Sequence, residues 1–246
     1  MKKSKWQLVI AGGLLVVSIV LYAMHYFIFK DLHHIFLWSL TSLAFLPVSV
    51  LLVTLLINRL LTDRDRRSRL EKMNMVIGAF FSEVGNGLLS LLAQWDDDSG
   101  PLWQIVKVGS EWRDAEYKSA LKRIKAHRYL VNEDLVNLSK AKEFLGSRRL
   151  FLLRLLENPN LLEHESFTAL LRAVLHVIEE LEYRESLNEL PEADVKHLAG
   201  DLRRAYALLV RQWLQYLWFI RRAYPYLFSL AIRTNPFDPK ASAVLH

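Results

Sequence analysis

The chain has 246 residues, of which 52% are hydrophobic and 24% charged, and its formal net charge is +6 at pH 7. This composition excludes a disordered polymer and a collagen-like repeat, because the apolar share is high and no glycine period is present. Since cysteine is absent, a disulfide framework, a thiolate metal centre and a cysteine nucleophile are excluded as well.

Two long apolar segments near the N-terminus predict membrane-spanning helices. Residues 6–29 and 35–57 contain no Asp, Glu, Lys or Arg, and each segment is longer than the roughly 20 residues that a helix needs to cross the hydrocarbon core. Lipid cannot hydrogen-bond the backbone, so both segments should be helical throughout. Pro47 lies inside the second segment and is expected to kink it. The sequence therefore predicts a two-helix transmembrane hairpin over residues 1–61, with residues 30–34 as its connector.

Basic residues lie at the two ends of this hairpin and set its expected orientation. Lysines precede the first span, and the connector has a single lysine. An arginine-rich stretch follows the second span and is expected to contact the inner leaflet: Arg64, Arg66, Arg67 and Arg69. By the positive-inside rule, both termini are cytoplasmic and the protein belongs to the inner membrane. A signal peptide is the competing interpretation of residues 1–29, but the apolar run is long for one and no A-x-A cleavage site follows it.

Polar side chains gather in the outward connector. Asp31, His33 and His34 are close together in the sequence. They are candidates for binding a divalent metal, or for sensing pH, because imidazole titrates near neutral pH. The simpler interpretation is that polar residues keep a turn in water. A symmetric oligomer would repeat the cluster around an axis and so favour the metal or pH-sensing role.

The second span carries small polar residues among its apolar ones. Ser42, Ser49, Thr54 and Asn58 can bond back to their own helix or across to a neighbouring helix. They are therefore candidates for a helix–helix interface, and alternatively for the lining of a pore. No ionised residue lies in this span, so a proton relay or a charge-selective ring inside the bilayer is not expected.

Residues 62–246 are expected to form a cytoplasmic all-α domain, so the predicted fold class is an all-α membrane protein. Within Met73–Trp95, apolar residues recur every three or four positions and define one helical stripe. Three interpretations of this segment stay open: a core helix, a helix lying on the membrane, and a further transmembrane pass. Glu83 is an isolated acid in it, and is therefore a candidate buried charge.

Shorter helices are expected after a polar turn at residues 96–101. Their approximate ranges are 111–125, 133–145, 148–157, 166–187 and 191–224. Gly146 is expected to end the second of them, and Ser147 and Ser166 to cap the third and the fourth. Pro225 should interrupt the last.

Charge is unevenly distributed along these helices. Acids dominate residues 157–201, whereas residues 202–233 carry arginines and no acid. We expect the two stretches to pair antiparallel, within the chain or between subunits. The domain as a whole is nearly balanced in charge, so no nucleic-acid partner is expected.

Motifs that would indicate catalysis are missing from the sequence. It contains no phosphate-binding loop, no G-x-S-x-G elbow and no H-E-x-x-H helix. His176 and Glu180 are four residues apart and can meet on one helix face, but one imidazole and one carboxylate are too few for a metal centre. No cofactor is expected.

These patterns favour a non-enzymatic integral membrane protein. We expect it to form homo-oligomers in the lipid bilayer and to use its cytoplasmic helices for interaction with a protein partner or for signal relay. The alternative is a homo-oligomeric ion channel or small-solute pore lined by the second span. A third hypothesis is a membrane-tethered enzyme that uses Glu83.

Overall fold

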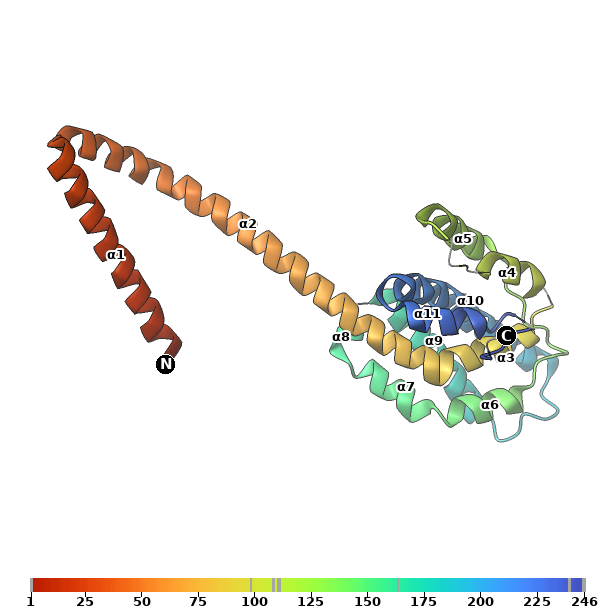
Figure 1. Ribbon diagram of the computed structural model, residues 1–246. Helices are drawn as coiled ribbons and strands as arrows, with labels where there is room; N and C mark the ends of the chain where they lie inside the picture. Colours follow the sequence, from red (N-terminus) through yellow and green to blue (C-terminus); the bar gives the residue numbers. More distant parts are fainter. Residues whose placement is uncertain are drawn as a thin grey trace. The chain divides into compact units, whose positions relative to one another are not determined.

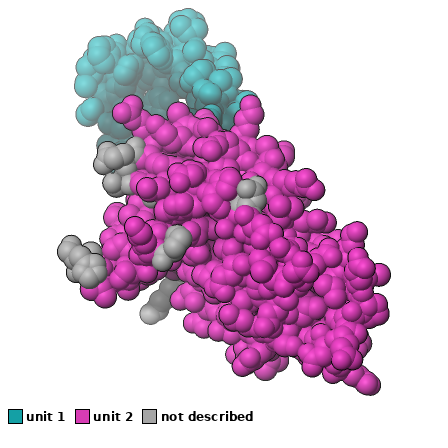
Figure 2. All heavy atoms as spheres, turned by 90° about the vertical axis from the view of Figure 1, so that its right-hand side faces the viewer, with its two compact units in different colours: residues 1–66 teal, residues 67–246 magenta. Residues whose placement is uncertain are grey.

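The computed structural model describes residues 2–97, 99–107, 109, 112–162, 164–238 and 240–244. Within these ranges every regular element is helical, which confirms the all-α prediction. The chain divides into two compact units, residues 1–66 and 67–246 (Figure 2).

Unit 1 consists of α1 (Lys2–Phe29) and the first part of α2 (Leu32–Phe80) (Figure 1). Only Lys30 and Asp31 separate the two helices, and Lys30 has a left-handed φ of 52°, which reverses the chain in a short space. Asp31 begins α2, because its Oδ1 accepts a hydrogen bond of 3.1 Å from the backbone N–H of His34. The connector is therefore shorter than the predicted one, and α2 continues through Pro47.

The apolar side chains of unit 1 are exposed. The windows Val9–Phe29 and Leu32–Arg64 have mean hydropathies of 2.0 and 2.4 and are 0% buried. Both helices are long and apolar enough to cross a membrane. A third window, Leu70–Gln94, has a mean hydropathy of 1.5, but half of it is buried within the fold.

That third window forms the start of the core of unit 2. It includes the end of α2, a π-helical turn η1 (Phe81–Gly85) and α3 (Asn86–Gln94). Among the described residues, this arrangement supports the core-helix interpretation, because the predicted apolar stripe is almost entirely buried. The segment is not one regular α-helix, however. Consecutive residues are buried in pairs here, and the wider turn adjusts the helix register so that both members of a pair face inward.

Eight further helices follow in the described part of unit 2. They are α4 (Ser99–Val106), α5 (Asp114–Ala126), α6 (Leu138–Gly146), α7 (Arg149–Leu156), α8 (Pro159–Leu162), α9 (Glu165–Glu182), α10 (Glu192–Ala223) and α11 (Pro225–Arg233). The two longest, α9 and α10, pack against each other. Helices α6, α7 and α8 pack against α9, whereas α3, α5 and α11 pack against α10 (Figure 1). The core of unit 2 is therefore built around the α9–α10 pair.

Two of the predicted helix caps are wrong. Ser166 does not begin α9; His164 does, because its Nδ1 accepts a hydrogen bond of 3.1 Å from the backbone N–H of Phe167. The Ser166 hydroxyl instead donates to Oε1 of Gln212 at 3.2 Å. The Ser147 hydroxyl likewise donates to a carbonyl of the preceding helix, at 2.9 Å, and this residue is the C-cap of α6 and not the N-cap of α7. Both serines lie within hydrogen-bond reach of other acceptors, which compete with capping.

The acidic and basic stretches were expected to pair, and the helices that carry them do pack together, but ion pairs between their charges do not account for the contact. Helices α9 and α10 do pack together. Two α10 arginines, however, form ion pairs away from α9: Arg204 pairs with Asp201 of its own helix, and Arg222 pairs with Asp114 of α5. The α9–α10 contact depends mainly on buried apolar side chains such as Leu171, Val174 and Leu209.

Candidate functional site

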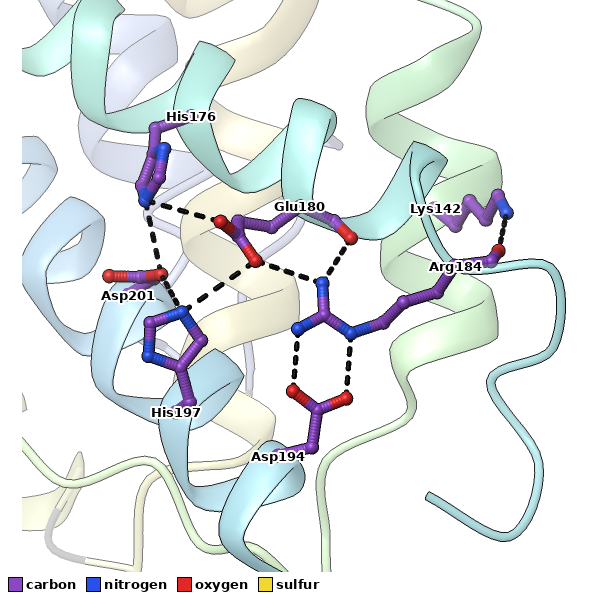
Figure 3. A network of polar contacts seen from close by, with 7 residues as sticks. All are labelled: Lys142, His176, Glu180, Arg184, Asp194, His197 and Asp201. Carbon is purple, nitrogen blue, oxygen red and sulfur yellow. Dashed lines mark hydrogen bonds and ion pairs between the residues drawn. The ribbon is translucent and has the colours of Figure 1, made fainter. Parts of the chain in front are cut away.

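The most concentrated group of charged side chains in the described structure lies between α9 and α10. Helix α9 and the turn after it contribute three side chains at intervals of four residues: His176, Glu180 and Arg184. The first turns of α10 contribute Asp194, His197 and Asp201. Each set projects from one face of its helix, and the antiparallel packing brings the two sets together (Figure 3). We call these six residues the α9–α10 cluster.

Each imidazole of the cluster lies between the same two carboxylates. Nε2 of His176 is 3.3 Å from Oδ2 of Asp201 and 3.9 Å from Oε1 of Glu180. Nε2 of His197 is 3.4 Å from the same Asp201 oxygen and 3.6 Å from Oε2 of Glu180. Imidazole and carboxylate groups therefore alternate around a ring, as the dashed lines in Figure 3 show.

Asp201 is the buried member of the ring. Its side chain is 4% exposed, and its Oδ2 receives no hydrogen bond. Its Oδ1 pairs with Arg204 at 3.2 Å. A buried carboxylate oxygen without a donor is costly, and both imidazole rings lie close to this oxygen.

Arg184 fixes the other side of the cluster. Its Nε and Nη2 donate to the two oxygens of Asp194 at 2.7 and 2.6 Å, and its Nη1 donates to Oε2 of Glu180 at 2.9 Å. These hydrogen bonds hold the pKa of both carboxyl groups below their usual values. Lys142 of α6 donates to the backbone carbonyl of Arg184 at 3.0 Å, which connects a third helix to the cluster.

In this arrangement the Nε2 atom of each imidazole faces carboxylate oxygens of two different residues, so an N–H at this atom of either ring has an acceptor nearby. As they stand, the four ring residues are not positioned to hold a metal ion together. No other group of three or more His, Asp or Glu side chains in the described part of the chain is so positioned.

The three polar residues of the predicted connector have separate surroundings in the structure. Asp31 caps α2, and His33 is exposed. His34 accepts a hydrogen bond at Nε2 from Nε1 of Trp38 at 3.0 Å, and its ring stacks on that of His25 at 5.7 Å. The described residues here do not form a metal-ligand group within one chain.

The structure also describes the polar candidates of the second span and one of the four arginines. Ser42, Thr54 and Asn58 are exposed. The Ser49 hydroxyl donates to the carbonyl of Phe45 at 3.2 Å, so its own helix satisfies it. Arg64 is also exposed, whereas the side chains of Arg66, Arg67 and Arg69 lie outside those that the structure describes.

Glu83 is exposed, so the prediction of a buried charge is wrong. The physical reason is its place in η1, where Phe81 and Val84 turn inward and Glu83 turns out. Its backbone carbonyl has a partner nonetheless, because Nε of Arg148 donates to it at 2.8 Å.

Comparison with known proteins gives the chain a family. A model of the "MJ1433, N-terminal helical domain" matches residues 2–61, and a model of the "Uncharacterized protein MJ1433, C-terminal helical domain" matches residues 69–233. The relative described as "Uncharacterized protein MJ1433", from Methanocaldococcus jannaschii, is 43% identical over 241 residues, which cover 98% of this chain and 97% of the relative. The chain belongs to the MJ1433 family. No solved structure matches it.

Both family models describe helical domains, in agreement with the all-α fold. The α9–α10 cluster lies wholly within the range that matches the C-terminal helical domain of MJ1433. Of this cluster, only the His176–Glu180 pair is predictable from the spacing within one helix. A second pair with the same spacing, His197 and Asp201, was the missing signal, because two such pairs on successive helices converge when the helices pack antiparallel.

Proposed function

We propose that this protein is an integral membrane protein that self-associates and uses its helical domain, unit 2, for interaction or signal relay. One observation supports this proposal most directly. Helix α2 runs unbroken from Leu32 to Phe80, and its first part is exposed and apolar whereas its end is buried in the core of unit 2. A single helix is thus common to both units.

The exposed surface of unit 1 is the reason for placing it in lipid. Soluble proteins rarely expose contiguous apolar surface beyond a few hundred Å². Here large apolar side chains are exposed on all faces of both helices, with Phe27 at 75% and Phe36 at 69%. The basic flanks support an orientation with both termini in the cytoplasm.

The relay part of the proposal rests on the continuity of α2 from Leu32 to Phe80. A rotation or shift of α2 within the bilayer would reach the side chains near its end, such as Ile77 and Phe80, which are 1% and 0% exposed. Packed cores respond to such shifts by changing between discrete arrangements. The α9–α10 cluster joins the two longest helices of the same core, so it is a candidate regulator of the relay.

Single cysteines test self-association, since the natural chain has none. Ser42→Cys and Met75→Cys introduce thiols at exposed positions of α2, and Leu150→Cys on α7 is a control that is 71% exposed. We expect oxidation in native membranes to give covalent dimers for positions on α2 and not for the control. Failure to cross-link at several successive positions of the span would overturn self-association.

A membrane-impermeant maleimide tests the orientation independently. His33→Cys should be labelled from outside intact cells, whereas Ser242→Cys should be labelled only after lysis. Labelling of both, or of Ser242→Cys alone, would contradict cytoplasmic termini. The number of subunits per nanodisc distinguishes the relay from the pore, because one hairpin cannot enclose a pathway. An assembly of four or more subunits would justify flux assays.

A further inference from the structure

A hollow beside α10 is lined largely by arginine. It has a volume of about 450 Å³ and lies within unit 2. Its lining residues are Arg128, Tyr129, Gly200, Arg203, Arg204 and Ala207. We propose that this hollow binds a phosphate group, carried either by a soluble molecule or by a lipid headgroup.

The backbone brings the three guanidinium groups to one place. Gly200, Arg203, Arg204 and Ala207 are spaced by three and four residues, so they share one face of α10. Gly200 and Ala207 are small, which leaves the space between the arginines open. Nη2 of Arg203 lies 3.9 Å from the point that a Cβ at position 200 would occupy.

Arg128 comes from a different element and is held next to α10 by its neighbour. Tyr129 is 8% exposed, and its hydroxyl donates to the carbonyl of Ile124 at 3.0 Å. Its ring packs edge-on against Tyr206 of α10 at 5.2 Å. The segment after α5 is therefore anchored to α10, which places Arg128 beside Arg203 and Arg204.

The charges of the hollow are unbalanced. None of the described residues that line it is acidic. Within the described structure, Arg128 and Arg203 form no ion pair or hydrogen bond through their side chains. Arg204 pairs with Oδ1 of Asp201 at 3.2 Å, which orients its guanidinium group. Asp201 also belongs to the α9–α10 cluster, so Arg204 shares this one carboxylate with the two histidines. Guanidinium groups in this number attract an anion.

The chemistry of the hollow favours phosphate over other anions. Arginine presents a planar fork of N–H donors that matches two phosphate oxygens at once, and it remains charged at any physiological pH. Half of the six lining residues are arginines, so these donors supply the charge that would recognise the ligand. Because the hollow is open, binding should weaken as the salt concentration rises.

Two probes distinguish the sources of phosphate, using the full chain in nanodiscs. Isothermal titration with inorganic pyrophosphate in phosphatidylcholine nanodiscs tests a soluble ligand. Native mass spectrometry after reconstitution with phosphatidylglycerol and phosphatidylcholine tests retention of an anionic lipid. We expect at least one probe to bind the natural protein, and Arg128→Gln/Arg203→Gln to weaken that binding by about tenfold or more, since each charged hydrogen bond is strong.

The control variant is Arg154→Gln/Arg172→Gln, which removes the same charge from exposed sites outside the hollow. Unchanged binding by this control, with loss in the first variant, would support the hollow as the site. Equal loss in both variants would show a general charge effect and overturn the proposal. Absence of binding by the natural protein to either probe would also overturn it. The pyrophosphate result does not depend on self-association or relay.

Discussion

The turn η1 provides the sharpest test of the core. Gly85 lies in this turn with helical dihedrals, φ −61° and ψ −47°, so an alanine there needs no change of backbone. Space is the obstacle. A Cβ at this position would lie 2.4 Å from Cδ1 of Phe81 and 3.0 Å from Cε1 of Phe80. Neither ring is free to move, because Phe81 stacks on Tyr216 at 5.1 Å and Phe80 packs edge-on against Phe167 at 5.3 Å.

The net effect of Gly85→Ala follows from two opposing contributions. Overpacking a tight core costs up to about 3 kcal/mol, and two immobile rings place this site near the upper end of that range. Alanine recovers about 1 kcal/mol through its higher helix propensity. The free energy of unfolding should therefore fall by about 2 kcal/mol. In a domain of this size, that change lowers Tm by roughly 4–8 °C.

Thermal unfolding of the full chain in detergent, followed by tryptophan fluorescence, measures this change. Trp95 and Trp213 are 4% and 1% exposed, so their emission reports on the core of unit 2. Gly146→Ala is the matched control, because nothing lies within 4 Å of its Cβ position and the change should leave Tm equal or slightly higher. A Gly85→Ala protein as stable as the natural one would refute the argument that this turn requires glycine.

Three further predictions concern polar contacts. Burial lowers the pKa of His164, so the neutral imidazole stabilises the fold above the unfolded pKa of about 6.5, and this stabilisation is lost as pH falls through the folded pKa. The Tm of His164→Asn should therefore depend less on pH between pH 8 and 5 than the Tm of the natural protein. Arg184→Lys should lower Tm by a few degrees, because lysine cannot form the two-bond fork to Asp194, and an unchanged Tm would contradict this role. Arg222→Gln should shift Tm by less than about 2 °C, because its pair with Asp114 is exposed; a larger fall in thermal melts would show a structural role.

Long periodic segments were predictable from the sequence, because their signals extend over many residues. The two apolar segments are helices, and the stripe from Met73 to Trp95 is buried nearly as its spacing indicates. The π turn at Phe81–Gly85 was not predictable in the same way. Its sequence fits a regular helix, and only the surrounding rings decide which residues face inward.

The candidate site depended on contacts that local patterns do not encode. His176 and Glu180 were visible as a pair, but their second partners come from another helix, and the register between α9 and α10 decides which residues meet. The prediction of the α9 cap was wrong for a related reason. His164 caps α9 in place of Ser166, because the serine hydroxyl donates a hydrogen bond to Gln212, which lies far along the chain.

The π turn also affects how the length of this helix segment can vary. In η1 the N–H of Asn86 bonds to the carbonyl of Phe81, five residues back, so one residue is present beyond what an α-helix would hold. Deleting one residue from within the turn would leave Asn86 four residues after Phe81, which is the spacing of a regular α-helix, so the side chains that follow, such as Leu88 and Leu92, would keep their faces. Alignments of family members can therefore carry a one-residue gap at this turn while the core positions on both sides stay matched, and such a gap would change only which side chains of the turn itself face the core.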